Sequence, residues 1–291
     1  MAVSDPVIDE QTPAADFTIA QKWDRYTEAE HRVWDTLYQR QMEILKDRAV
    51  EEFRTGLSLL DLGSGGIPDL DVINPKLQAL TGWTVVMVPH LVPDGVFFDH
   101  LANRRFPAGR FIRKADQLDY LEEPDIFHDI FGHVPMLTLP VFADYMQAYG
   151  RGGLRAESLG RLKELARLYW YTVEFGLIRR PEGLRIYGAG IVSSAGETPF
   201  SLESESPNRI AFDLERVMRT DYRIDDFQQL YVVIDSFEQL LDATQQDFGP
   251  IYNRLARDTT MHGVTDLLNS DSVLTRGTQN YAIAKARELA S

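Results

Sequence analysis

Two of the six histidines, His128 and His133, lie five residues apart in the stretch Glu123–His133. Neutral imidazole is the commonest protein ligand for transition metals, so the pair is a candidate metal site. In a regular helix, positions five apart lie about 140° apart around the axis. Both rings can therefore face one ion only if the helix bends or loosens, and Gly132 supplies that freedom. The competing interpretation is two ordinary histidines, one of them half-buried.

A candidate third ligand, Glu174, lies downstream. Residues 154–178 predict a helix whose second half carries little polar surface, so Glu174 is expected to be buried. A buried carboxylate needs a metal ion or a cation to compensate its charge. The alternative is an ion pair with one of the two arginines that follow the helix. Ala166 and Trp170 precede Glu174 at four-residue spacing, which predicts that Trp170 lines the same cavity.

Two imidazoles and one carboxylate on one face of an ion leave several coordination positions open. This arrangement is typical of non-heme Fe(II) enzymes that bind oxygen and substrate together. Zinc hydrolases also use such ligands, but they commonly space the histidines four apart and place a general-base Glu beside the first. Here the neighbour is Asp129 and the spacing is five. The pattern favours iron without excluding zinc.

Composition restricts the classes of function. The chain has 291 residues, a formal net charge of −14 and no cysteine. Disulfides and thiolate metal sites are therefore excluded, and a surface that tracks nucleic-acid phosphates is not expected. The N-terminus lacks the features of a secretory signal, and no stretch approaches about 18 consecutive apolar residues. We expect a cytoplasmic protein that binds neither nucleic acid nor membranes.

The elements that must position these residues form a mainly helical α+β domain without regular strand–helix alternation. Residues 1–22 are expected to form a flexible tail, and residues 23–291 a single catalytic domain. A long helix is predicted from the capping box of Thr27 and Glu30 to Gly56. Further helices are predicted at 72–80, 96–101, 197–203, 211–220 and 237–256, the last interrupted near Gly249, and short strands at 84–88, 111–113, within 184–194 and at 231–234. Periodicity assigns no structure to the last 35 residues.

A second class of function is suggested by the loop Asp61–Gly66. A short apolar run, an aspartate and clustered glycines resemble the first motif of nucleotide-cofactor folds, including methyltransferases that use S-adenosylmethionine. Such folds place an acidic residue at the end of the next strand. The strand predicted at 84–88 instead runs into Pro89 and His90. A glycine-rich surface loop is the simpler explanation.

Three motifs in order carry a more specific resemblance. They are the segments 123–135, 169–177 and 187–197. Together they resemble the catalytic core of the pterin-dependent aromatic amino acid hydroxylases, and most closely that of the compact bacterial members that act on phenylalanine. The similarity runs from about Ile67 to about Phe237. It implies a monooxygenase that uses Fe(II), a tetrahydropterin such as tetrahydrobiopterin, and O2 to convert L-phenylalanine to L-tyrosine.

The resemblance also implies roles for individual residues. The iron ligands would be His128, His133 and Glu174, with Asp125 orienting this region. The tetrahydropterin would contact His90, Leu91, Val92, Phe97, Asp129 and Ala166. The amino acid substrate would contact Arg113, Trp170 and Ser193, with Arg113 pairing with its carboxylate.

Departures from the animal enzymes imply further expectations. The chain has no long segment before the core and no evident assembly helix, so no regulatory domain, no tetramerisation domain and a monomer are expected. Tyrosine hydroxylases carry an Asp where this chain has Ile224. The apolar side chain favours phenylalanine over tyrosine, whereas tryptophan hydroxylation remains an alternative within the family.

Overall fold

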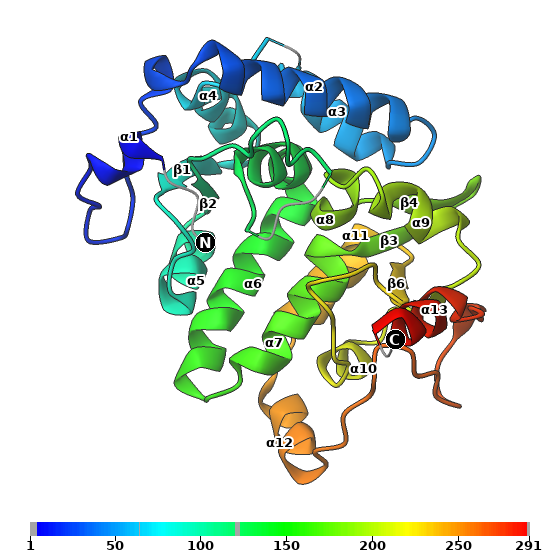
Figure 1. The fold of residues 1–291 in the computed structure, drawn as a ribbon. Helices are drawn as coiled ribbons and strands as arrows, with labels where there is room; N and C mark the ends of the chain where they lie inside the picture. Colours follow the sequence, from blue (N-terminus) through cyan, green and yellow to red (C-terminus); the bar gives the residue numbers. More distant parts are fainter. Residues whose placement is uncertain (1–4, 64, 120–122, 290–291) are drawn as a thin grey trace.

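Helices make up most of the molecule, and two small sheets complete it (Figure 1). The computed structural model describes residues 5–63, 65–119 and 123–289. This architecture confirms the mainly helical α+β class. The α-helices are α1 (Pro6–Asp9), α2 (Glu28–Ile44), α3 (Glu51–Leu59), α4 (Leu70–Thr81), α5 (Asp94–Ala102), α6 (Pro140–Ser158), α7 (Leu162–Tyr169), α8 (Ala189–Val192), α9 (Glu197–Glu203), α10 (Leu214–Met218), α11 (Phe237–Gln245), α12 (Gly249–Arg257) and α13 (Asn280–Leu289).

The strands form one parallel pair and one mixed sheet. The strands are β1 (Thr84–Val88), β2 (Arg105–Gly109), β3 (Gly176–Arg180), β4 (Gly183–Ile186), β5 (Asn208–Ala211), β6 (Leu230–Ile234) and β7 (Val273–Thr275). The pair joins β1 to β2, and the larger sheet has the order β4-β3-β6-β5-β7. In the larger sheet β6 is parallel to both of its neighbours, and all five of its residues are buried. Among the described residues, no helix combines the length and the apolar character needed to cross a membrane.

The first long helix is divided in two, which corrects the prediction of one helix ending at Gly56. The capping box is present, because the Thr27 hydroxyl accepts from the backbone N–H of Glu30 and the Glu30 carboxylate accepts from that of Thr27. The helix stops at Ile44, and Asp47 adopts a left-handed φ of 61°. Backbone hydrogen bonds then join the connecting segment to Ile186 at the end of β4. A contact distant in sequence thus ends the helix.

The helix predicted over 154–178 was also wrong in its extent. Helix α6 ends at Ser158, and Gly160 turns the chain in a left-handed conformation with a φ of 67°. Helix α7 then runs antiparallel beside α6 (Figure 1). A π-helical segment, Trp170–Glu174, follows α7, and the chain enters β3 at Gly176. Pairing with β4 and β6 takes the last residues of the expected helix into the sheet.

Other predicted elements are largely confirmed, with one misplaced strand. The strand at 84–88 and the helix at 197–203 have the predicted bounds. The helix beginning at Phe237 is interrupted at residues 246–248, just before Gly249. The strand expected at 111–113 is wrong. The strand is β2, which ends at Gly109, and its Pro107 and Gly109 concealed it because both residue types are rare in strands.

The N-terminal segment is attached to the domain from Asp5 onward. Val7 and Ile8 are 5% exposed, and the buried carboxylate of Asp5 pairs with the buried guanidinium of Arg110. Farther along, Ile19 forms a β-bridge with Met87 of β1. The sequence suggested a loosely held tail here because the buried partner of Asp5, Arg110, is 105 residues away in the chain. Residues 1–4 of that predicted tail lie outside the described part of the chain.

Candidate active site

The two histidines lie on a π-helical segment, Phe127–His133. A π-helix pairs residues five apart, so it aligns positions that a regular helix would separate. His128 and His133 therefore face the same space, and the loosened turn that the sequence predicted near Gly132 is this π-helical segment. The packing at Gly132 is tight, because a Cβ there would lie 3.0 Å from the carbonyl oxygen of Ala189 in α8.

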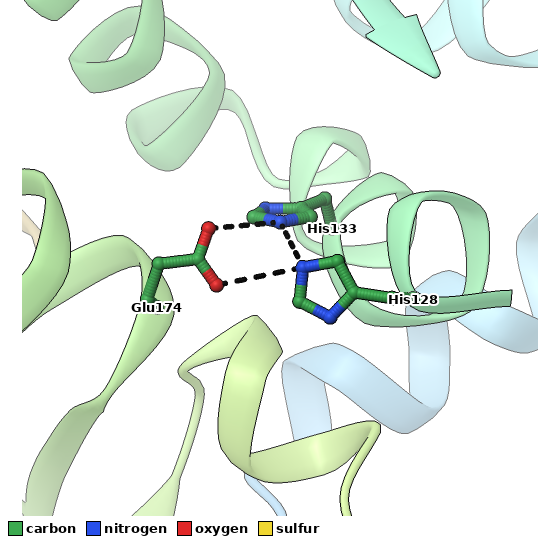
Figure 2. A group of neighbouring side chains, drawn as sticks. All are labelled: His128, His133 and Glu174. Carbon is green, nitrogen blue, oxygen red and sulfur yellow. Dashed lines mark hydrogen bonds and ion pairs between the residues drawn. The ribbon is translucent and has the colours of Figure 1, made fainter. Parts of the chain in front are cut away.

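Three donor groups converge on one point (Figure 2). The Nε2 atoms of His128 and His133 are 3.2 Å apart, and Glu174 Oε1 lies 3.2 Å from His133 Nε2. Glu174 Oε2 lies 3.6 Å from His128 Nε2. Donors this close can share one ion held at roughly 2 Å from each. Figure 2 shows that both imidazoles come from one helical segment and that the carboxylate faces them from another. The arginine alternative for Glu174 does not hold, since Arg179 and Arg180 pair elsewhere.

The hydrogen bond between His128 and Ser193 determines which imidazole nitrogen is free. Ser193 Oγ donates to the carbonyl of Ala189 at 2.8 Å, which uses its only hydrogen. It must then accept from His128 Nδ1, 2.9 Å away. Nδ1 is therefore protonated, and Nε2 presents its lone pair to the other donors. Such an outer hydrogen bond is the usual way in which a protein orients a metal-binding histidine.

Asp125 organises the start of the same segment. Its carboxylate accepts from the backbone N–H of His128 at 3.1 Å and from that of Arg113 at 2.9 Å. It also forms a two-point ion pair with the Arg113 guanidinium, at 2.8 and 2.9 Å. Asp125 is fully buried. One carboxylate thus joins the π-helical segment to the chain after β2.

Burial keeps the site in the protonation state that binds a cation. It lowers the pKa of His128 to about 4, so the imidazole is neutral at physiological pH. Burial alone would raise the pKa of Glu174, but the facing His133 and the N–H of Gly190 outweigh it and lower that pKa. The donor set is thus two imidazoles and one carboxylate. It fits a divalent transition metal such as Fe(II).

A row of aromatic rings leads away from His133. Its imidazole lies 6.2 Å from the ring of Tyr169, nearly parallel to it, and Tyr169 meets Phe97 edge to face at 5.9 Å. Phe97 belongs to α5 and is partly exposed. Tyr169 thus connects Phe97 to the side of His133, and the Phe97 ring offers an aromatic face on which a flat ligand could stack. Sequence reasoning missed Tyr169, although its place in the motif that ends at Glu174 was a usable signal.

Asp129 faces the same region. Its carboxylate accepts from the backbone N–H of Gly109 at 2.8 Å. Burial raises the pKa of Asp129 to about 7. The side chain is thus held at the end of β2, next to His128 in sequence.

Comparisons with known proteins agree with this geometry. Residues 13–261 match the model of the biopterin-dependent aromatic amino acid hydroxylases. The chain belongs to this family. It is 67% identical to phenylalanine-4-hydroxylase of Caulobacter vibrioides, over 94% of this chain and 92% of that protein. It is 61% identical to phenylalanine-4-hydroxylase of Ralstonia nicotianae, over 94% and 87% respectively.

Solved structures of one relative show the same fold. Phenylalanine hydroxylase of Chromobacterium violaceum bound to cobalt is 55% identical, with a TM-score of 0.91 over 94% of this chain and 100% of that one. The form of that enzyme with bound iron and phenylalanine is 54% identical, with a TM-score of 0.87 over 91% and 97%. The predicted hydroxylase-type catalytic domain is thereby confirmed.

Besides the π-helix, the residues expected to contact the pterin come from α5, from α7 and from the connection between β1 and α5. His90, Leu91 and Val92 form the connection between β1 and α5. Leu91 is 77% exposed, whereas Nδ1 of His90 is buried without a hydrogen-bond partner in the described structure. Ala166 lies in α7, one turn before Trp170, and is partly exposed. The contact of these residues with a pterin stays a prediction.

Arg113 and Trp170, which are expected to contact the substrate, each form hydrogen bonds to other side chains of the protein. The Arg113 guanidinium is 8% exposed, and Asp125 engages one edge of it. The carbonyl of Leu118 accepts from Nη1 at 3.4 Å, so two of the five N–H donors of the guanidinium stay available for a second carboxylate. Trp170 stacks on Tyr222 at 4.5 Å and donates from Nε1 to the side chain of Gln228 at 3.0 Å. Gln228 carried no signal in the sequence.

The loop Asp61–Gly66 does not form a nucleotide cradle in the part that is described. The backbone N–H groups of Gly65 and Gly66 both donate to Asp35 of α2, at 2.7 and 2.9 Å. His31 accepts from the next N–H, that of Ile67. The donors that a phosphate would need are occupied within the fold. Together with the family match, this disfavours the methyltransferase alternative.

Proposed function

We propose that this protein is a monooxygenase that hydroxylates the ring of L-phenylalanine to give L-tyrosine, with Fe(II), a tetrahydropterin and O2. The convergence of His128, His133 and Glu174 within 4.8 Å of one another is the observation that carries the proposal. Relatives named phenylalanine-4-hydroxylase at 57–67% identity support the choice of substrate. Bound together, the iron and the tetrahydropterin would supply the electrons and the site for oxygen activation.

The residues of this chain would position the reactants and exclude water. His128, His133 and Glu174 would hold the ion and leave positions open, while Ser193 keeps His128 in the required tautomer. The Phe97 ring would orient the pterin by stacking, with Asp129, Ala166 and the 90–92 connection around its edge. Arg113 would bind the substrate carboxylate, because a guanidinium forms directed hydrogen bonds to it. Trp170 would form a wall for the aromatic ring.

Selectivity for phenylalanine is proposed to involve Ile224. Its side chain is 73% exposed. Ile224 lies two residues after Tyr222, and Tyr222 stacks on Trp170. An apolar residue here gives no hydrogen-bond partner to a ring hydroxyl. The same side chain leaves tryptophan as the competing substrate to be tested.

The proposal extends to the organisation of the protein. We infer a cytoplasmic monomer in which residues 23–291 form the catalytic domain. The partners are expected to be the small molecules of the reaction, with no nucleic acid. The net charge of −14 disfavours contact with polyphosphates.

Anaerobic reconstitution with Fe(II) tests the reaction. The protein is then given tetrahydrobiopterin, O2 and equal amounts of phenylalanine, tyrosine or tryptophan, and the products are separated. We expect tyrosine from phenylalanine at the highest rate and no product without the pterin. Hydroxytryptophan as the main product would overturn the choice of substrate, and no hydroxylation with any substrate would overturn the proposed activity.

A further inference from the structure

A buried chain of hydrogen bonds lies behind Trp170. The indole Nε1–H of Trp170 donates to the side-chain oxygen of Gln228 at 3.0 Å. The backbone N–H of Gln228 donates to Glu197 at 3.1 Å, and the hydroxyl of Tyr231 donates to the same carboxylate oxygen. Gln228 and Glu197 are each 4% exposed. The indole of Trp170 is therefore bonded to Gln228, and Gln228 is in turn fixed by its hydrogen bond to Glu197.

The same glutamine side chain also shapes the segment 221–227. Its amide nitrogen donates to the carbonyls of Arg223 and Asp226, at 2.9 and 3.2 Å. The start of the segment is attached separately, because the hydroxyl of Tyr171 donates to the carbonyl of Asp221. Between these points the segment carries Tyr222, which stacks on Trp170 with an interplanar angle of 20°. Gln228 thus contacts both the edge of the indole and the loop that covers its face.

Few other interactions could orient the Trp170 ring. Phe175 packs against it at 4.8 Å, but aromatic contacts allow the rings to slide and tilt. A hydrogen bond from Nε1 fixes the direction of the ring plane. Because the acceptor is buried, an indole that turned away would leave a buried oxygen without a donor, which is unfavourable.

We propose that Gln228 is a positioning residue for the amino acid substrate, acting through Trp170 and the 221–227 segment to set the width of the aromatic pocket. This inference rests on the proposed function, since it takes Trp170 to be a wall of the substrate site. Gln228 contacts none of His128, His133 and Glu174 in the described hydrogen bonds. Its loss should therefore affect binding of phenylalanine more than turnover.

The test compares Gln228→Met, which keeps side-chain length and removes the side-chain hydrogen bonds to the indole and to the 221–227 segment, with Trp170→Phe, which removes the indole N–H together with the five-membered part of the ring. Each change should raise the phenylalanine KM about fivefold, the effect of one lost hydrogen bond, with kcat within about twofold. The double variant should be no worse than the more impaired single variant, because both act on one interaction. Additive effects in the double variant would show that Gln228 does not act through Trp170.

Gln229→Met is the matched control. Gln229 is the next residue, is 5% exposed and has its own hydrogen bonds, to Ser206 and to the carbonyl of Phe227. The variant Gln229→Met should lose about as much thermal stability as Gln228→Met but keep the phenylalanine KM of the unsubstituted protein. An equal rise in KM in this control would overturn the proposal in favour of general loosening of the chain that leads into β6.

The outcomes separate this inference from the proposed function. If the unsubstituted protein forms no tyrosine, the proposed function fails. If it forms tyrosine and neither Gln228→Met nor Trp170→Phe changes the phenylalanine KM, only the positioning role fails. Should Gln228→Met not fold, Trp170→Phe still decides the matter, since an unchanged KM there overturns the role of the indole hydrogen bond.

Discussion

At the scale of single residues, the chemistry of the site depends on one proton of Ser193. Its hydroxyl hydrogen is committed to the carbonyl of Ala189, so its oxygen can only accept from His128. The imidazole lone pair on Nε2 is thereby directed at Glu174 and His133. Ser193, which is 65 residues away from His128 in the chain, thus determines which nitrogen of that imidazole is presented.

Glu174→Gln is expected to remove most of the iron affinity. The amide keeps the size of the side chain but takes away the only negative charge of the donor set. The loss should exceed the ~10–100-fold that follows removal of an outer hydrogen bond. Bound iron is measured after anaerobic reconstitution and desalting, together with the melting temperature.

Glu182→Gln is the control for that change, because Glu182 is 56% exposed between β3 and β4. It should bind iron as the unsubstituted protein does. Full iron content in Glu174→Gln would mean that the carboxylate is not a ligand.

Glu197 is expected to make stability depend on pH. Burial raises its pKa from 4.5 to about 7, against the opposing hydrogen bonds from Tyr231 and Gln228, and Asp226 adds to the rise. The protonated form is favoured in the folded state, so this contribution is complete below pH 4.5 and is lost as pH rises to about 7.

Glu197→Gln cannot titrate, so its free energy of unfolding relative to the unsubstituted protein should increase by roughly 1–3 kcal/mol between pH 4.5 and pH 8. Urea unfolding of both proteins at the two pH values measures this difference. A difference that does not change with pH would show that folding does not raise the pKa of Glu197.

At the scale of elements, the contact between α5 and α6 controls the position of Phe97. The two helices approach closely at glycines of α6: a Cβ on Gly150 would lie 2.4 Å from the backbone nitrogen of Ala102, and one on Gly153 would overlap the ring of Phe98. Any side chain at these positions must push α5 outward. The proposed pterin site would move with it.

Gly150→Ala should destabilise the protein by about 1–3 kcal/mol and raise the KM for the tetrahydropterin. Gly152→Ala provides the contrast, because nothing lies within 4 Å of a Cβ there. It should stabilise α6 by about 0.5–1 kcal/mol and leave the pterin KM unchanged. Thermal unfolding and steady-state kinetics on both variants give the comparison. Similar behaviour of the two would contradict the close approach of α5.

At the scale of the whole molecule, the N-terminal segment is fastened to the domain by a buried ion pair. The Arg110 guanidinium pairs with Asp5, donates to the carbonyls of Gln21 and Lys22 and lies 4.3 Å from the centre of the Tyr26 ring. These contacts join the first residues of the described chain to the end of β2. The segment therefore contributes to stability.

Asp5→Ala is expected to cost about 3 kcal/mol, because it leaves a buried cation without its carboxylate. Glu10→Ala removes an exposed pair with Arg25 and should change stability by no more than about 0.5 kcal/mol. The free energy of unfolding in urea distinguishes them. Equal, small effects would show that the segment is only loosely attached.

The sequence by itself indicated the mainly helical class and the three donors that the structure brings together, His128, His133 and Glu174. The histidine spacing, the glycine between them and an acid in an apolar helix are local features, and local features control helix geometry. The same reasoning predicted β1, α9 and the interruption before Gly249. Glycine and proline end helices and strands through their own backbone conformations, so their effect is local in the sequence.

Only the tertiary structure decided where the long helices end and what surrounds the ligands. Helix α2 ends where the chain reaches Ile186, and the helix expected over 154–178 gives way to β3. Ser193, the hydrogen-bond partner of His128, is 65 residues away from it in the chain. Gln228, the partner of Trp170, is 58 residues away. Such contacts depend on which surfaces pack together, and a hydrogen bond between distant residues leaves no periodic pattern in either segment.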